Sequence, residues 1–180
     1  NNILLIFDEV QTGMGRTGTL FCYEQYGIEP DIMTLGKNIG SGFPLSAMLT
    51  TEKLNIFEPG DQGGTYTGQP LAMAVGLAVI NELLNAGFLE NVNHISAYLK
   101  AKLADLSTQF PIDNIRGKGL LLAFDLSEGD AFKLATNCME NGLLLNATNE
   151  KTLRLIPPLI VSEKDCDEMF EILKQSLKSA

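Results

Sequence analysis

The first fifty residues alternate between short apolar runs and glycine-rich polar loops. Residues 3–7 form an apolar run without alternation, which is typical of a strand covered on both faces in a parallel sheet, and the run ends in Asp8-Glu9. Two further strands are expected at residues 31–35 and 45–50, with glycine-rich loops around them. Strands whose carboxyl ends lead polar residues into such loops predict an α/β layered domain with its functional site at that edge.

Helical periodicity dominates from residue 69 onward. Residues 69–85 are rich in alanine and leucine on nearly every face, which predicts a long buried helix. After Gly87 the chain places apolar residues at helical spacing with charged residues between them, which predicts an amphipathic surface helix (Val92, Ile95, Leu99, Leu103 and Leu106). This change of character places the expected domain boundary near residue 87, between domains at 1–87 and 88–180.

Local start and stop signals define the remaining elements. Asp130 is a typical helix N-cap, Asn141-Gly142 is a stop signal, and Ser162 with Asp165 forms a capping pattern. The expected helices therefore cover residues 130–140 and 162–177, with a shorter one at 19–26. The expected strands of the second domain are residues 112–115, 120–126, 143–146 and 153–156.

The composition narrows the possible function classes. The 180 residues carry 13 Lys and Arg against 22 Asp and Glu, a net charge of −9, with no basic run to suit nucleic acid or an anionic membrane. No apolar stretch approaches the roughly 20 residues of a membrane span. Three scattered cysteines without CxxC spacing exclude a disulfide framework and a cysteine zinc site, and favour core positions in a cytoplasmic protein (Cys22, Cys138 and Cys166).

The beginning of the chain is unusual for a complete protein. It starts with Asn1-Asn2 and enters the first apolar run at once, without an initiator methionine, a basic segment or a cleavage site. This is not the pattern of a signal peptide. We therefore expect a further part of the protein to precede Asn1.

Two side chains at strand ends are candidates for chemistry. A carboxylate in the position of Asp8 can bind a metal, pair with a cationic ring or cap a loop, and an apolar run before Asp-Glu is also the Walker B pattern of ATPases. Lys37 follows the second strand among small residues, where a flat ligand can approach closely. Burial or a neighbouring cation would make its amine a nucleophile for aldehydes and ketones, and the simpler interpretation is an exposed loop lysine.

Two later positions could bind anions. Thr65 lies in the Gly/Thr-rich residues 63–70 before the long helix, and a helix N-terminus attracts anions, although such clusters also occur in plain loops. Arg154 lies in an apolar strand, where its partner is either a substrate carboxylate in a bidentate pair or an internal carboxylate. The sole histidine, His94, is expected at the surface, and without a second ligand cluster we predict no metal site.

Several short motifs follow one another along the chain and are more specific together than any one of them. They are the strand ending in Asp8-Glu9-Val10-Gln11, Pro30-Asp31, Gly36-Lys37, Gly42-Phe43-Pro44, Gly64-Thr65, Arg116-Gly117-Lys118-Gly119 and Arg154 to Pro158. In this order they resemble the fold-type I, class III pyridoxal-phosphate aminotransferases, and residues 7–18 look most like the members that act on N-acetylornithine. The resemblance implies the C-terminal part of a large parallel-sheet domain followed by a small α+β C-terminal domain.

The resemblance implies a role for each candidate. Lys37 would bind the aldehyde of pyridoxal 5′-phosphate and then transfer a proton between the substrate Cα and the cofactor. Asp8 would keep the ring nitrogen protonated, and Gln11 would contact the 3-oxygen of the ring. Thr65 would bind the phosphate from the neighbouring subunit of a homodimer, and Arg154 would pair with the substrate α-carboxylate.

The implied reaction is a transamination in arginine biosynthesis, in which N-acetylornithine gives up its amine and 2-oxoglutarate collects it as glutamate. Ornithine, succinylornithine and 4-aminobutyrate are the competing amine donors, and an inactive fragment or a P-loop ATPase are the competing hypotheses for the chain. The part expected before Asn1 would supply the ring-stacking aromatic and most phosphate contacts. The sequence departs from the family at Thr67-Gly68-Gln69-Pro70, where Gly-Gly-Asn-Pro is expected, and at Gly36, where alanine is usual.

Overall fold

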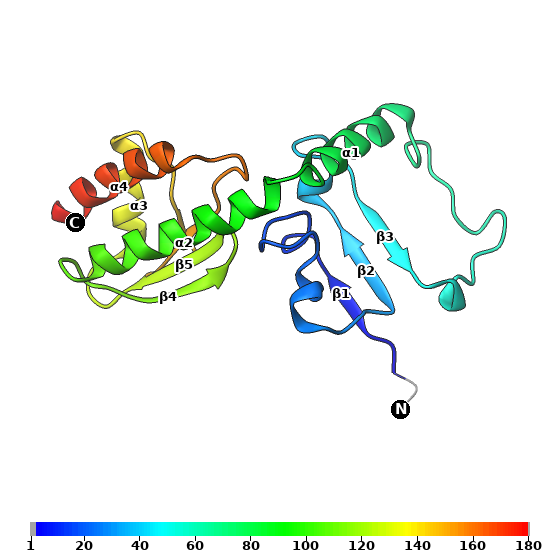
Figure 1. Ribbon diagram of the computed structural model, residues 1–180, viewed down its shortest axis with the longest axis horizontal. Helices are drawn as coiled ribbons and strands as arrows, with labels where there is room; N and C mark the ends of the chain where they lie inside the picture. Colours follow the sequence, from blue (N-terminus) through cyan, green and yellow to red (C-terminus); the bar gives the residue numbers. More distant parts are fainter. Residues whose placement is uncertain (1–2, 180) are drawn as a thin grey trace. The chain divides into compact units, whose positions relative to one another are not determined.

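The chain folds into two compact units, which are described separately. The structure is a computed structural model that describes residues 3–179. Unit 1 extends to Leu89 and unit 2 begins at Glu90. Figure 1 shows that each unit has its own sheet and its own helices.

Unit 1 contains a three-stranded mixed sheet. Its strands lie in the order β1-β2-β3, with β1 parallel and β3 antiparallel to β2. The 23-residue connection from β1 to β2 is long enough for a parallel crossover, whereas the 11 residues between β2 and β3 favour an antiparallel return. The elements are β1 (Ile6–Asp8), η1 (Cys22–Tyr26), β2 (Ile32–Leu35), η2 (Lys37–Ile39), β3 (Ala47–Thr50), η3 (Glu52–Leu54) and α1 (Pro70–Leu83).

The first strand is shorter and more exposed than the apolar run predicts. Hydrogen-bonded pairing begins only at Ile6, and the side chains of residues 3–6 are exposed, with Ile3 at 77%. The expectation of a strand covered on both faces is therefore wrong for the described structure. The physical reason is that only β2 packs extensively on β1 among residues 3–179, and no α-helix covers either face of the run.

The helix α1 also differs from its expectation. Its bounds agree with the predicted range, and the Gln69 side chain caps its N-terminus by accepting the Ala72 N–H at 3.2 Å. Burial is confined to Ala72, Gly76 and Leu83, so the prediction of a helix buried on nearly every face is wrong here. Only one face is packed: a Cβ on Gly76 would lie 2.8 Å from the Leu45 side chain.

Unit 2 contains an antiparallel four-stranded sheet with helices. The strand order is β4-β5-β7-β6, and α3 packs against α4 and against β6 and β7. Alternation along β5 gives the sheet one apolar face, with Leu122, Phe124 and Leu126 buried, and one polar face. The elements are α2 (Phe88–Ser107), β4 (Ile112–Lys118), β5 (Leu121–Leu126), α3 (Ala131–Glu140), β6 (Asn146–Ala147), β7 (Thr152–Leu155) and α4 (Glu163–Lys178).

The local signals of unit 2 are confirmed. All five predicted apolar positions of α2 are buried. Asp130 caps α3 by accepting the Phe132 N–H at 2.8 Å, and Ser162 and Asp165 form a reciprocal capping box on α4. The exception is the strand expected at 143–146, because β6 contains only residues 146 and 147 and pairs with β7 alone.

The cysteines occupy interior or half-buried positions, as expected. Cys138 and Cys166 are buried and Cys22 is half-buried, and no disulfide links them. Burial raises the pKa of Cys138 and, together with nearby carboxylates, that of Cys166 to about 11, so both are poor nucleophiles. In residues 3–179 no single helix is long and apolar enough to cross a membrane, although the bent pair α1 and α2 meets the length and composition criteria together.

Candidate active site

The parallel pair β1 and β2 brings two of the predicted site residues to one edge of the unit 1 sheet. Asp8 is the last residue of β1 and is level with Thr34, and the Glu9 N–H donates to the Thr34 carbonyl at 2.9 Å. Lys37 follows two residues after the end of β2. Since both strands run in the same direction, Asp8 and Lys37 extend from the same carboxyl edge, which is where α/β sheets bind ligands.

Asp8 has an exposed carboxylate beside an open cavity. Its Oδ1 accepts the Val10 N–H at 3.0 Å, which fixes the first turn after β1. The cavity has a volume of about 230 Å³, and Asp8 is the only predicted site residue that lines it. The other lining residues are Ile6, Phe7, Glu9, Thr12, Cys22, Tyr23 and Tyr26.

Lys37 lies on a strained turn with its side chain exposed. Its φ angle is 45°, in the left-handed region that non-glycine residues enter at a cost of about 1–3 kcal/mol. The turn closes because the Gly40 N–H donates to the Lys37 carbonyl at 3.2 Å, and a Cβ on Gly40 would overlap the Phe43 carbonyl oxygen. Within residues 3–179 the Lys37 amine forms no hydrogen bond or ion pair, so it is available to a ligand.

Gly36 lies where the segment that carries Lys37 packs against the turn that follows Asp8. A Cβ on this residue would lie 3.1 Å from the nearer methyl group of Val10, closer than an ordinary contact. The segment before Lys37 therefore packs directly on the turn that follows Asp8. Alanine at this position, the usual residue of the family, would require Val10 to move by a few tenths of an ångström.

Glu9 organises the loop beside the site, a role that the sequence pattern did not predict. Its carboxylate is buried and accepts three hydrogen bonds: from Thr12 Oγ1 at 2.7 Å, Cys22 N–H at 3.0 Å and Tyr23 N–H at 2.8 Å. These bonds tie η1 back to the end of β1. The Asp-Glu doublet carried a signal, because neighbouring residues of extended backbone point to opposite sides and the two carboxylates therefore meet different surroundings.

Arg16 is a second buried charge in the same loop. Its side chain is 7% exposed, and this burial lowers the pKa of its guanidinium. Thr17 nearby is also buried, and its hydroxyl donates to the Thr12 carbonyl at 3.1 Å. The loop after β1 is thus held by internal polar contacts, and its residues Glu9 and Thr12 line the cavity beside Asp8.

The remaining candidates of unit 1 are less constrained. Gln11 is half-buried in the turn after β1 and does not line the cavity near Asp8. Thr65 lies in an exposed turn before α1, where the Thr67 N–H donates to the Gly64 carbonyl at 3.1 Å. The described structure does not join either residue to Asp8 or Lys37 through a side-chain hydrogen bond, so their roles stay predictions.

Arg154 belongs to unit 2 and lies on β7. It is half-buried, its neighbours Leu153 and Leu155 point into the core, and its backbone pairs with Ala123 on β5. Its Nε atom is buried without a hydrogen-bond partner, and no ion pair to it occurs in the described part of the chain. His94 is largely exposed, as expected, with its Nε2 2.7 Å from Glu163 Oε1.

Comparison with known proteins identifies the family. The sequence model described as aminotransferase class-III matches residues 1–177. The chain belongs to the class-III aminotransferase family. This membership makes the P-loop ATPase hypothesis wrong and confirms the resemblance to class III aminotransferases.

Curated relatives within this aminotransferase family are similar over nearly the whole chain. It is 46% identical to the acetylornithine aminotransferase of Caldanaerobacter subterraneus, over 98% of this chain and 45% of that protein. It is 50% identical to the acetylornithine aminotransferase of Ralstonia nicotianae, over 99% of this chain and 46% of that protein. The chain therefore spans about half the length of the curated relatives it matches.

Solved aminotransferases share the fold. The acetylornithine aminotransferase of Elizabethkingia anophelis matches with a TM-score of 0.91 and 32% identity, over 99% of this chain and 46% of that one. Ornithine δ-aminotransferase of Plasmodium falciparum matches with a TM-score of 0.90 and 36% identity, over 99% of this chain and 48% of that one. The fold is thus the α/β fold of the fold-type I aminotransferases.

Proposed function

We propose that this chain carries the lysine-bearing part of a pyridoxal-phosphate-dependent aminotransferase site. The observation that supports this most directly is the parallel pairing of β1 and β2, which leads Asp8 and Lys37 to one sheet edge. Residues 1–87 would belong to the large cofactor-binding domain and residues 88–180 to the small domain. We expect the protein to act in the cytoplasm as a homodimer.

The side chains at this edge suit the cofactor in chemical terms. The Lys37 amine is exposed and without a partner in residues 3–179. The Asp8 carboxylate accepts only one hydrogen bond there, from the Val10 N–H. The chemistry that pyridoxal 5′-phosphate supplies when bound is an aldehyde carbon for amines and a cationic ring that withdraws electrons. An unpaired amine and an acidic partner are the two groups that such a molecule needs.

Each residue of the chain then has a defined task. The Lys37 amine holds the aldehyde carbon and afterwards carries a proton to and from the substrate Cα. The Asp8 carboxylate keeps a proton on the ring nitrogen, Gln11 orients the ring through its 3-oxygen, and Thr65 donates to the phosphate. Arg154 binds the substrate α-carboxylate. Its Nε–H has no hydrogen-bond partner in the described residues, so this donor can contribute to that contact.

The proposed reaction converts N-acetylornithine and 2-oxoglutarate to N-acetylglutamate semialdehyde and glutamate, a step in arginine biosynthesis. Sequence identity of 44–50% to several proteins named acetylornithine aminotransferase supports this donor. Ornithine is the second candidate, because solved ornithine aminotransferases match the fold with TM-scores near 0.90. Succinylornithine and 4-aminobutyrate are further candidate donors, and turnover compared across these four amines would separate them.

The decisive experiment is covalent capture of the cofactor by the 180-residue chain. After incubation with pyridoxal 5′-phosphate and borohydride reduction, peptide mass spectrometry should find the added mass on Lys37. The Lys37→Ala variant should lose this adduct, while Lys53→Ala, which removes another exposed lysine of unit 1, should retain it. An adduct spread evenly over surface lysines would contradict the assignment and favour an inactive fragment.

A further inference from the structure

The polar face of the unit 2 sheet carries two arginines in one row. In register, Arg116 of β4 lies opposite Ala123 of β5, and Ala123 lies opposite Arg154 of β7. Directly opposed residues of antiparallel strands share a face, so both guanidinium groups extend from the same side of the sheet. The alanine between them leaves the row without a bulky side chain at its centre.

A β-bulge is responsible for the presence of Arg116 on this face. The register shifts between Asp113 and Arg116, so Asn114 and Ile115 together oppose the single residue Phe124. Asn114 adopts a φ angle of 45°, which this residue type tolerates better than most. The extra residue re-aims the strand, as bulges generally do.

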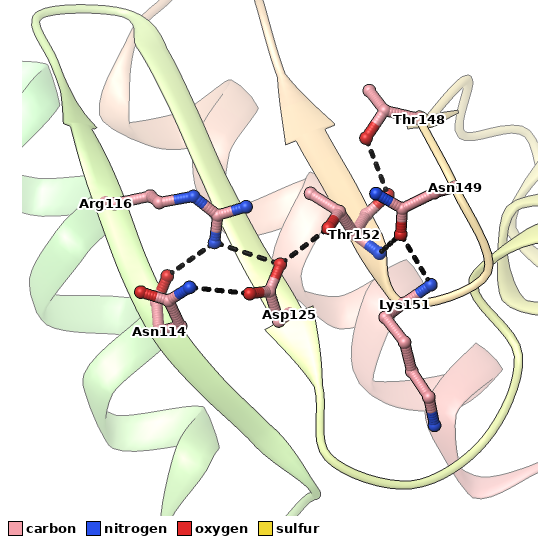
Figure 2. Close-up of polar contacts among 7 residues, drawn as sticks. All are labelled: Asn114, Arg116, Asp125, Thr148, Asn149, Lys151 and Thr152. Carbon is pink, nitrogen blue, oxygen red and sulfur yellow. Dashed lines mark hydrogen bonds and ion pairs between the residues drawn. The ribbon is translucent and has the colours of Figure 1, made fainter.

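The next row contains the only carboxylate of β5, and its oxygens are already occupied. Figure 2 shows the Asp125 carboxylate held between β4 and β7. Its Oδ1 lies 2.9 Å from Arg116 Nη1 and accepts the Thr152 hydroxyl at 2.7 Å. Its Oδ2 accepts the Asn114 side-chain amide at 2.6 Å. The same Arg116 nitrogen also donates to the Asn114 carbonyl at 2.9 Å, which locks the bulge.

Asn149 fixes the strand that carries Arg154. Its Oδ1 accepts the backbone N–H groups of Lys151 and Thr152 at 2.8 and 2.9 Å (Figure 2). The Thr148 N–H donates to the Thr152 carbonyl at 2.9 Å, so the turn before β7 is closed on itself. Thr152 is therefore held in place to donate its hydroxyl to Asp125 rather than to turn away.

Asp125 is also the carboxylate that would compete with a ligand for Arg154. Arg154 lies opposite Ala123, two residues from Asp125 along β5, so the two side chains are diagonal neighbours about 7–8 Å apart at their bases. A free carboxylate there would pair with the arginine. Instead, Arg154 forms no ion pair in residues 3–179, and its Nε–H has no partner.

The pKa of Asp125 reflects this occupation. Burial by itself would raise the pKa, but the hydrogen bonds from Thr152, Asn114 and Arg116 outweigh burial and hold the pKa below its ordinary value. The carboxylate is therefore ionised at neutral pH and remains a potential partner for a cation.

We propose that Arg116, Asn114 and Thr152 are positioning residues that occupy Asp125 and so keep Arg154 open to a ligand carboxylate. The inference rests on the proposed function in one respect, because it takes Arg154 as the carboxylate-binding group. It adds that the anion affinity of Arg154 is set by three residues that do not touch the ligand.

The test measures carboxylate binding by the full chain without cofactor. In NMR titrations with 2-oxoglutarate, the Arg154 Nε–H signal reports occupancy of the guanidinium directly. Arg116→Gln should weaken binding roughly three- to tenfold, the size expected for an unscreened carboxylate at this distance. The double variant Arg116→Gln with Asp125→Asn should restore the affinity, because the competitor is gone.

Two charge-neutral variants exclude a simple effect of net charge. Thr152→Val and Asn114→Gly each remove one donor to Asp125 without changing the charge, and glycine tolerates the positive φ at position 114. Each should weaken binding about twofold in the native background and have no effect beside Asp125→Asn. Lys118→Gln removes a cation from the same strand without freeing Asp125 and should cause less weakening than Arg116→Gln.

The outcomes separate this inference from the proposed function. If Arg154→Gln does not reduce 2-oxoglutarate binding, the assignment of Arg154 is wrong and the positioning role falls with it. If Arg154→Gln abolishes binding while Arg116→Gln, Thr152→Val and Asn114→Gly leave it unchanged, only the positioning role is wrong. The positioning role would also be overturned if the folded double variant Arg116→Gln with Asp125→Asn did not regain the native affinity.

Discussion

The two units use similar apolar patterns with different results. In unit 2 the apolar stripe of α2 and the apolar face of β5 are buried, and Leu103 has no exposed surface. In unit 1 the apolar residues of β1, β3 and α1 are largely outside, with Leu77 at 60% exposure. An apolar pattern therefore predicts that a surface packs against another segment. Only the structure shows whether that segment belongs to the same unit. Extended exposed apolar surface of this kind is typical of interfaces, in line with the proposed homodimer.

The largest expected effect tests this comparison directly. Leu103→Ala should lower the free energy of unfolding of unit 2 by roughly 2–5 kcal/mol, because it leaves a cavity in a closed core. Leu77→Ala should change the stability of unit 1 by less than about 0.5 kcal/mol, because the side chain is exposed. Urea unfolding followed by hydrogen exchange resolves the two units, and equal losses from both variants would contradict the comparison.

A second substitution examines the turn that presents Lys37. Gly40→Ala should destabilise unit 1 by about 1–3 kcal/mol, because the added methyl overlaps a backbone carbonyl that cannot rotate away. Gly63→Ala is the matched control, since nothing lies within 4 Å of its added Cβ. Thermal unfolding of the two variants compares them, and an unchanged melting temperature for Gly40→Ala would show that the turn can relax.

The third prediction concerns the buried carboxylate beside the site. Glu9→Gln keeps the shape of the side chain but loses its charge, and we expect a loss of about 1–3 kcal/mol from the three hydrogen bonds that it accepts. Hydrogen exchange at the Cys22 and Tyr23 amides should accelerate. Glu29→Gln changes an exposed carboxylate of the same loop and should leave these amides unaffected.

The smallest effect is a pH-dependent one in unit 2. Ser162→Ala removes the α4 cap and should cost about 1 kcal/mol at neutral pH. Hydrogen bonds from the Ser162 side chain and backbone lower the pKa of Asp165, so this carboxylate stabilises the fold above its unfolded pKa and loses the effect as the pH falls through its folded pKa. The difference between the urea midpoints of the two proteins should therefore narrow below about pH 4, without vanishing, because the Ser162 hydroxyl still accepts the Asp165 N–H.

Sequence patterns predicted more of unit 2 than of unit 1, for a physical reason. The caps at Asp130 and Ser162 and the apolar face of α2 depend on residues a few positions apart, so the sequence predicted them well. Cover for residues 3–6 and for α1 depends on segments distant in sequence, and there the predictions failed. The strand pattern located β3 but not its direction, which depends on how it pairs with β2.

The candidate site shows the same division. Motif spacing was enough to select Asp8 and Lys37, because strand direction follows from the α/β pattern and brings both to one edge. The hydrogen bonds of Glu9 join residues 13 and 14 positions apart, so they appear only in the folded loop. Likewise, no pattern in the sequence indicates that Arg116 and Arg154 share a row, because a bulge determines it.

Because of that bulge, the number of residues in β4 determines which side chains of the strand can contact Asp125. An edge strand ordinarily tolerates the loss or gain of a residue better than a central one does, since it has only one neighbour. Deleting Ile115 would restore regular pairing and leave Arg116 opposite Ala123, but it would place Asn114 alone opposite Phe124, on the apolar face and away from Asp125. We therefore expect variation in length to be tolerated in the hairpin turn and at the chain end, and rejected at this position.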